Sequence, residues 1–225
     1  MDRSTAEFEA ESAYASALFC QMRGDGDGCV HMLQRSLEWL PTYAPAMQAF
    51  GIAQYQLGQR AEGRRLLMGL LDLNEDTAHL FKIIDQAGDF LIEKRRYLDG
   101  LELYRGAAAR FPSVAVFFQG ISCCADHLKR FEEAIAACRE ALSLDPINAK
   151  LVSDLGWCLF RAGRIAEALV ELERAVEMDP ADELARGNLN LVRKEITRGS
   201  RARKKPRADS LWPADGSDAR SPSQP

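Results

Sequence analysis

The sequence lacks the segments that would place the chain in a membrane or mark it for secretion. No apolar run approaches the roughly 20 residues needed to span a bilayer. The first residues are acidic and have neither the basic nor the apolar stretch of a secretory signal. The six cysteines include no CxxC pair, and no histidine accompanies them at metal-ligand spacing. We therefore expect a soluble, cytoplasmic chain with reduced core cysteines, no metal and no cofactor.

Motifs of catalysis are also missing. His31, His79 and His127 are far apart, and none has a nucleophile or carboxylate partner at a recognised motif spacing. The run from Arg23 to Gly28 resembles the start of a calcium loop, but Ser36 stands where that loop needs a bidentate glutamate. We interpret this run as a turn between two helices. No catalytic residue and no enzyme activity are expected.

Charge is distributed unevenly along the chain. The net charge is −4, but residues 199–225 carry six basic and three acidic residues, which leaves −7 for residues 1–198. An acidic body lacks the basic face that phosphate contacts need, so no nucleic-acid partner is expected. Enrichment in Pro, Ser, Asp and Arg predicts a disordered tail over 199–225. Its basic run, 201–207, is interpreted as solvated, with a localisation signal, a nucleic-acid tether and an acidic-membrane contact as alternatives.

A repeat of 34 residues organises the rest of the sequence. Asp145-Pro146 and Asp179-Pro180 each close an apolar helical pattern, and the two prolines lie 34 residues apart. Small residues recur where two helices must approach closely, and proline stops the second helix of each unit except the second, where Glu75 replaces it. The same register predicts five helix pairs, at 10–43, 44–77, 81–114, 115–148 and 149–182, with 78–80 as a short insertion.

This pattern resembles that of the tetratricopeptide-repeat proteins. Leu155-Gly156, Ala168 and Ala175 stand at the family's small-residue and apolar positions in the last unit, and Phe118 and Ala134 do so in the preceding one. The resemblance implies an all-α fold, a right-handed α-solenoid of tandem antiparallel helix pairs. Because one pair cannot bury its apolar face alone, we expect caps at both ends. These are a helix start over 1–9, with Ser4 and Glu7 as a capping box, and a capping helix over 183–198.

In this family the first helix of each pair lines a concave groove that holds a partner. The resemblance therefore implies a binding groove at the inward positions of the first helices. These positions are Tyr14, Leu18, Gln48, Ile52, Tyr55, Lys82, Asp85, Asp89, Gln119, Asp126, Lys150, Ser153, Trp157 and Phe160. The groove is predicted to be apolar and aromatic at both ends and acidic in the middle, which favours a neutral or basic apolar segment. Trp157 is the expected anchor, and packing against the capping helix is its alternative role.

The expected function is a non-catalytic scaffold or adaptor that holds a partner peptide or helix. Two alternatives stay open. One is a dedicated chaperone for an aggregation-prone client, similar in architecture to those of bacterial secretion systems. The other is an accessory subunit that positions an enzyme partner. Self-association also stays open, because the ends and grooves of solenoids often associate.

Overall fold

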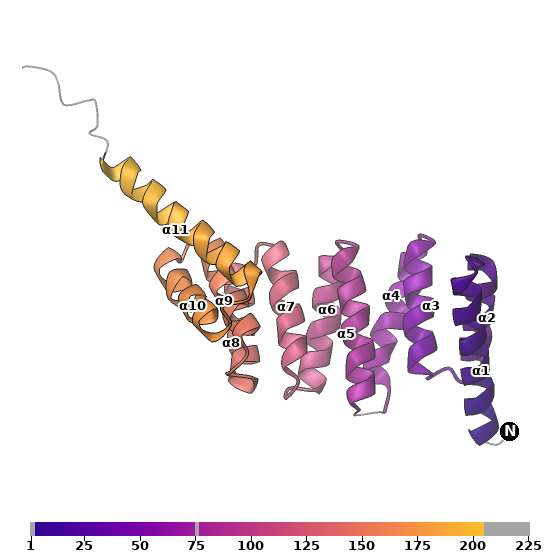
Figure 1. Cartoon of the computed structure of the whole chain (residues 1–225). Helices are drawn as coiled ribbons and strands as arrows, with labels where there is room; N and C mark the ends of the chain where they lie inside the picture. The colour runs from indigo at the N-terminus through magenta and orange to yellow at the C-terminus, as the bar shows by residue number, and fades with distance from the viewer. Residues whose placement is uncertain (1–2, 75–76, 205–225) are drawn as a thin grey trace, which may run out of the picture.

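The computed structural model describes residues 3–74 and 77–204, and these residues form α-helices and one 3-10 helix with no strand. Figure 1 shows the helices as a row of antiparallel pairs that ends in a projecting helix. In chain order the helices are α1 (Arg3–Met22), α2 (Gly26–Trp39), α3 (Ala44–Gln56), α4 (Arg60–Gly69), η1 (Leu70–Asp72), α5 (Ala78–Glu93), α6 (Tyr97–Arg110), α7 (Ala115–His127), α8 (Phe131–Leu144), α9 (Ala149–Arg161), α10 (Ile165–Met178) and α11 (Glu183–Lys204). The all-α solenoid predicted from the sequence is confirmed.

A left-handed backbone conformation marks the turn inside every helix pair. The residues in this conformation are Gly24 (φ 74°), Gly58 (φ 81°), Arg95 (φ 57°), Lys129 (φ 60°) and Gly163 (φ 79°). They lie 34 residues apart, except for 37 between Gly58 and Arg95. The left-handed residue lets the backbone leave one helix and reverse direction. The turns therefore repeat with the period read from the sequence.

Three additional residues lie between the second and third pairs, and they do not form a separate insertion. Ala78, His79 and Leu80 open α5, which has 16 residues where α3, α7 and α9 each have 13. The Thr77 side chain caps the helix by accepting a hydrogen bond from the Leu80 N–H at 3.2 Å. Three residues are close to one helical turn, so they lengthen the helix and leave its buried face in place.

Both ends of the array differ from the sequence-based expectation. The first helix begins at Arg3 and continues to Met22, so Ser4 lies inside its first turn and does not cap it. At the other end α11 continues through residues 199–204, which we expected to be disordered. Arg, Lys and Ala are strong helix formers, and within residues 199–204 they outweigh Gly199 and Ser200. The rest of the predicted tail, 205–225, lies outside the described residues.

The core between the third and fourth pairs is organised around one aromatic ring. Tyr104 of α6 is fully buried and reaches between α5 and α7, where Gly88 and Gly120 face its ring. Its hydroxyl donates to Asp85 of α5, whose carbonyl and carboxylate oxygens each lie 3.1 Å away. A Cβ on either glycine would overlap the ring. Glycine is therefore required at both positions for the helices to approach around Tyr104.

Ion pairs connect successive second helices on the opposite side of the array. Arg64 of α4 pairs with Glu102 of α6, and Arg105 of α6 pairs with Glu133 of α8. The side chains are largely exposed, so each pair contributes at most about 1 kcal/mol. The apolar core between the helices therefore contributes most of the stability of the array.

Replacing Lys129 by glycine should stabilise the protein by about 0.5–1 kcal/mol, because glycine adopts φ 60° without strain. Replacing Gly163 by alanine in the equivalent turn should destabilise it by about 1 kcal/mol. Urea unfolding of both variants measures the difference. If the two substitutions change stability in the same direction, left-handed strain is not the cause.

Replacing Gly88 by alanine should destabilise the fold by about 1–3 kcal/mol, because the new methyl group overlaps the Tyr104 ring. Gly187 of α11 is the matched control, since a Cβ there meets no atom within 4 Å. Its replacement by alanine should leave stability unchanged or raise it by up to about 1 kcal/mol. Thermal unfolding followed by circular dichroism compares the two, and an unaffected Gly88 variant would contradict the proposed packing.

Candidate functional site

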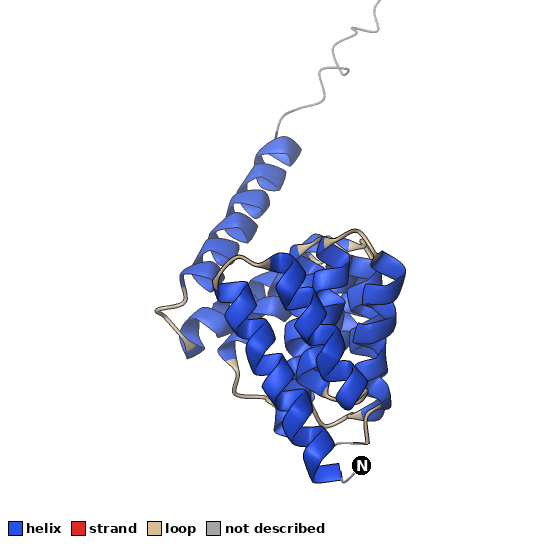
Figure 2. Ribbon diagram, turned by 90° about the vertical axis from the view of Figure 1, so that its right-hand side faces the viewer, coloured by secondary structure: helices blue, strands red, loops and turns tan. Residues whose placement is uncertain are grey.

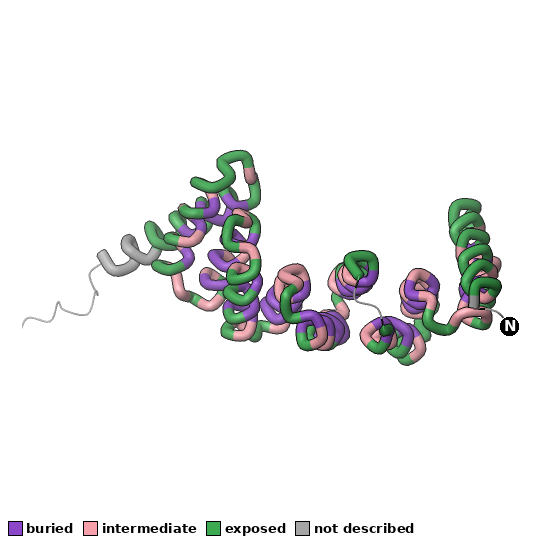
Figure 3. Tube along the Cα trace, turned by 90° about the horizontal axis from the view of Figure 1, so that it is seen from below, coloured by how far each residue is buried: buried purple, intermediate pink, exposed green. Residues whose placement is uncertain are grey.

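The first helices of neighbouring pairs form one side of the array. Helices α3, α5, α7 and α9 each contact the next in this order, although each pair is separated in sequence by the intervening second helix. Figure 2 is a view down the long axis of the array, from the end that holds α1, and Figure 3 shows the helices nearly end-on as a staggered row. Two concave surfaces lie along these first helices, one toward each end.

The larger cluster of polar side chains lies in a groove of about 500 Å³ formed by α5, α7 and α9, which we call the acidic groove. Six of the residues predicted from the sequence line it, namely Asp85, Asp89, Gln119, Asp126, Lys150 and Trp157. Ile92, Tyr104, Cys123, His127, Asp154 and Arg161 line it as well. A groove of this size accommodates a few side chains of a ligand.

One side of the acidic groove holds two carboxylates beside the Tyr104 hydroxyl. That oxygen lies 3.1 Å from Asp85 Oδ1 and 3.4 Å from Asp89 Oδ1. Burial raises the pKa of Asp85, and the nearby Asp89 charge adds to this, while the hydrogen bond from Tyr104 and the more distant Lys150 charge oppose it. Burial and the same two carboxylates raise the pKa of Tyr104. Asp85 is therefore a carboxylate whose charge is poorly compensated inside the protein.

The opposite side of the groove holds two more carboxylates with different partners. Asp126 is paired with Arg161 at 3.2 Å, so the acid predicted at this position is already neutralised. Asp154 accepts a hydrogen bond from Gln119 Nε2 at 2.8 Å, and burial raises its pKa. In residues 3–74 and 77–204, no ion pair within 4.0 Å joins Asp154, Asp85 or Asp89 to a basic nitrogen. Lys150 also lines the groove and lowers the pKa of Asp154 from a longer distance.

The second concave surface, which we call the apolar groove, has a volume of about 520 Å³ and is lined by the first helix pair and α3. Tyr14 and Leu18 of α1 and Gln48 and Ile52 of α3 line it, as the sequence predicts. The Gln48 amide donates to the Ile83 carbonyl and to Gln86 Oε1, each at 3.2 Å, which connects α3 to α5. The predicted apolar character of this end is therefore present, with Gln48 engaged inside the protein.

Four of the predicted residues line neither groove. Tyr55 points away from the grooves because its hydroxyl donates to Asp99 of α6 at 3.1 Å. Ser153 is fully enclosed in the helix packing, and Phe160 packs beside Trp157 with ring centroids 5.6 Å apart. Lys82 is exposed on α5. The inward face of each helix is thus narrower than the sequence pattern indicates.

Asp154, Arg161 and Tyr104 are groove residues that the sequence analysis missed. A signal existed for Asp154, because it lies four residues after Lys150 and three before Trp157, on the same helical face. Arg161 continues this face from Trp157. No comparable signal marked Tyr104, because it belongs to a second helix and reaches the groove only by passing between α5 and α7.

The cysteines of the groove are poor nucleophiles. Cys123 and Cys158 line the acidic groove, and burial raises the pKa of Cys123 to about 11. The Cys158 sulfur lies 3.7 Å from the Cys138 sulfur, and this contact and burial raise the pKa of Cys158. A thiol protonated at neutral pH does not attack a substrate efficiently. The groove therefore has the features of a binding surface and not those of a thiol active site.

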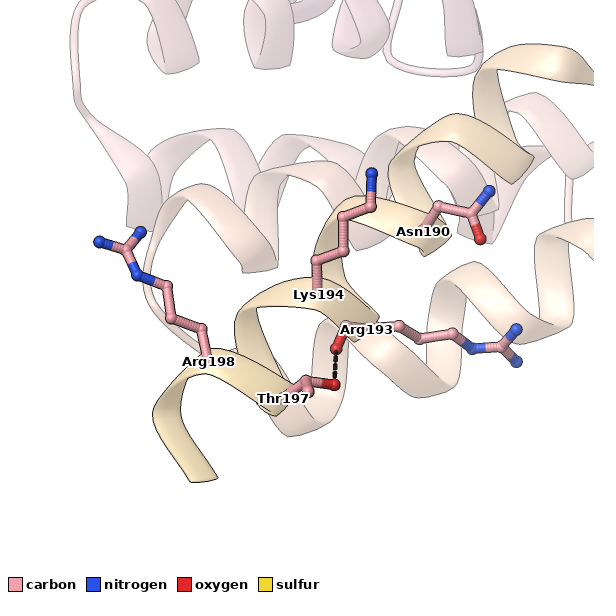
Figure 4. A pocket seen from close by; sticks show the side chains of 5 residues that line it. All are labelled: Asn190, Arg193, Lys194, Thr197 and Arg198. Carbon is pink, nitrogen blue, oxygen red and sulfur yellow. Dashed lines mark hydrogen bonds between the residues drawn. The ribbon is translucent and has the colours of Figure 1, made fainter. Parts of the chain in front are cut away.

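A third hollow lies on the projecting part of α11, and Figure 4 shows its basic and polar side chains. Thr197 donates to the Arg193 carbonyl at 2.9 Å, and Arg193 pairs with Glu173 of α10 at the same distance. All the lining residues come from α11, so a ligand would be contacted from one side only. This hollow is a weaker candidate than either groove.

Two structural features are absent from the described residues. No helix among them has the length and apolar character required to cross a membrane. No group of three or more His, Cys, Asp or Glu side chains in 3–74 and 77–204 is arranged to hold a metal ion.

Comparisons with known proteins agree with the helical repeat. A family model for the tetratricopeptide repeat matches residues 127–190, and a second model with the same description matches 86–149. Small glutamine-rich tetratricopeptide repeat-containing protein 2 of Mycosarcoma maydis is 26% identical over 113 residues, which cover 50% of this chain and 32% of that protein. The chain therefore matches about a third of that relative's length.

Solved structures of similar shape are also repeat proteins. MamA from Desulfovibrio magneticus RS-1 has a TM-score of 0.55 and 19% identity, over 78% of this chain and 97% of that one. YrrB, described as a TPR protein with an unusual peptide-binding site, has a TM-score of 0.54 and 16% identity, over 77% and 88% of the two chains. These identities show a shared fold. The two family models therefore identify residues 86–190 as tetratricopeptide repeats, and the described helix pairs, whose turns keep the 34-residue period, share the fold of these repeat proteins.

Proposed function

We propose that this chain is an adaptor whose acidic groove binds a neutral or basic apolar segment of a partner protein. Tetratricopeptide-repeat proteins mediate protein–protein interactions, and their fold is typically a non-catalytic scaffold. The observation that carries the proposal is the set of three carboxylates, Asp85, Asp89 and Asp154, which face one groove with no basic nitrogen within 4.0 Å among the described residues.

The charge of the groove determines which ligand fits. Asp85 and Asp154 are partly buried, so their charges are costly without an ion partner, and a cation brought by a ligand would recover part of that cost. Asp89 is exposed and adds its negative charge to the same groove. A Lys or Arg side chain brought into the groove would be attracted by these carboxylates. An acidic side chain would be repelled by the same groups.

The apolar contacts of the groove supply the remaining affinity. Trp157 is half-buried and lies beside Phe160, so the indole presents a rigid surface to the groove. Ile92 and Val116 lie on the helices opposite it. An apolar side chain next to the basic one would therefore pack against Trp157. This combination supports an extended or helical segment as ligand, as in other groove-binding interactions.

Replacing Trp157 by alanine should weaken binding about 30-fold, which corresponds to roughly 2 kcal/mol of lost apolar burial. Replacing Asp89 by lysine should abolish the preference for a basic peptide. The measurement is fluorescence anisotropy with short labelled apolar peptides that carry Arg, Gln or Glu at the centre, with affinities expected in that order. The control is Glu177→Lys, which makes the same charge change on the exposed surface of α10. Equal binding of the Glu and Arg peptides would refute the proposal.

Replacing Asp154 by asparagine should stabilise the free protein and weaken its binding. The folded-state pKa of Asp154 is raised by burial, so its ionised form costs stability at neutral pH, and this cost disappears as the pH falls through that raised pKa. Asparagine keeps an oxygen for the Gln119 hydrogen bond and carries no charge.

The expected gain in unfolding free energy is about 0.5–1 kcal/mol at pH 7 and less near pH 4. Urea unfolding at both pH values measures it, and the Arg peptide should bind the variant more weakly. A destabilised Asn variant at pH 7 would show that the carboxylate has a structural role.

Co-purification separates an adaptor from the two alternative roles. An adaptor should retain a folded partner through the groove, and the Trp157 variant should release it. A chaperone should instead keep one client soluble, and an accessory subunit should change the rate of an enzyme partner.

A further inference from the structure

The outer face of α1 carries a stripe of exposed apolar side chains. Phe8, Phe19 and Met22 are 68%, 58% and 85% exposed. With Ser12 and Ala15 they form the series 8, 12, 15, 19 and 22, whose alternating steps of four and three residues keep one side of a helix in line. The Arg23 guanidinium lies 5.6 Å from the Phe19 ring centroid and covers part of it. Large aromatic side chains this exposed on an ordered helix indicate an interaction surface.

This stripe is separate from the two surfaces of α1 that are already in use. Ala10, Ala13 and Ala17 are buried against α2. Tyr14 and Leu18 line the apolar groove. On a helix of 3.6 residues per turn, the stripe points about 170° away from the buried alanines. It therefore faces outward from the end of the array, where Figure 1 shows α1 and α2 as the terminal pair.

The sizes of the side chains along the stripe follow the same order in both directions along the helix. From Phe8 to Phe19 it is large, small, small, large, with spacings of four, three and four residues. A two-fold axis between Ser12 and Ala15 would place Phe8 against the partner's Phe19 and Ser12 against the partner's Ala15. A two-fold interface needs this kind of self-complementarity, because residue i must contact residue j and residue j must contact residue i. The small central pair also lets two helix axes approach closely.

We propose that the outer face of α1 binds a second copy of this chain through antiparallel helix pairing, which joins two arrays at their first helices. The charges of α1 favour this direction. Glu9 and Glu11 lie in the first half of the helix, and the half from Ser12 to Met22 has no acidic residue. Antiparallel pairing sets each acidic half against the partner's uncharged half, whereas parallel pairing would bring the acidic halves together.

The pairing has a limited extent. A helix of 20 residues is about 30 Å long, so the contact is small by the standards of permanent dimers. We therefore expect a reversible dimer that forms at micromolar concentrations. The stripe is separate from the acidic groove, so loss of the dimer and loss of peptide binding can be distinguished.

Light scattering after size-exclusion chromatography of the full chain tests the proposal over about 1–100 µM. The chain has a mass of 25.0 kDa, and the average mass should approach twice this value at high concentration. Phe19→Glu should leave a monomer with an unchanged circular dichroism spectrum, because Phe19 is exposed and contributes little to the core. Ile147→Glu is the matched control, since Ile147 is 85% exposed on another part of the surface, and it should dimerise like the natural chain.

A double variant tests the direction of pairing. Phe8→Glu alone should dissociate the dimer, and Phe8→Glu combined with Phe19→Lys should restore it, because each new Glu would then face the partner's new Lys. In parallel pairing Glu would face Glu and Lys would face Lys, and no restoration would occur. The proposal would be overturned if the natural chain stays monomeric at about 100 µM, the upper end of the concentration range. It would also be overturned if the Phe19→Glu variant still dimerises, or if the double variant does not regain the dimer.

Discussion

The Tyr104 ring lies between Gly88 and Gly120, and the spacing of the first helices around it determines the shape of the acidic groove. Side chains on either glycine would push α5 and α7 apart. The same ring sends its hydroxyl through to Asp85 on the groove side. Close packing and the polar lining of the groove therefore depend on one buried residue. In a repeat array each unit contacts only its neighbours, so a change at this position should act mainly on α5, α6 and α7.

The acidic groove combines stable packing with incomplete charge compensation. Asp126 is neutralised by Arg161, but Asp85 and Asp154 are partly buried without a basic nitrogen within 4.0 Å in the part of the chain that the structure describes. Such groups reduce stability, and proteins tolerate them most often at sites of function. The half-buried Trp157 beside them adds an apolar contact. This pairing of an aromatic surface with carboxylates is the physical basis of the proposed preference for basic apolar segments.

Part of the lining of the acidic groove could be predicted from the sequence. The resemblance to the repeat family implies that Asp85, Asp89, Lys150 and Trp157 face inward, and these residues do line one groove. Periodicity gives the direction of a side chain around its own helix but not the position of neighbouring helices. Tyr55 was therefore predicted to face the groove, although α6 lies close enough for its hydroxyl to bond Asp99.

The repeat could be recognised from the amino-acid sequence alone. Its 34-residue period is marked by residues with strong local effects, such as the prolines after second helices and the glycines in tight turns. The sequence also indicates the helical class and the approximate helix pairs. Only the tertiary structure decided that Arg161 neutralises Asp126, that Tyr104 crosses from a second helix to the groove, and that Phe8 and Phe19 remain uncovered. These features depend on distances between helices far apart in the chain, and a local pattern does not contain those distances.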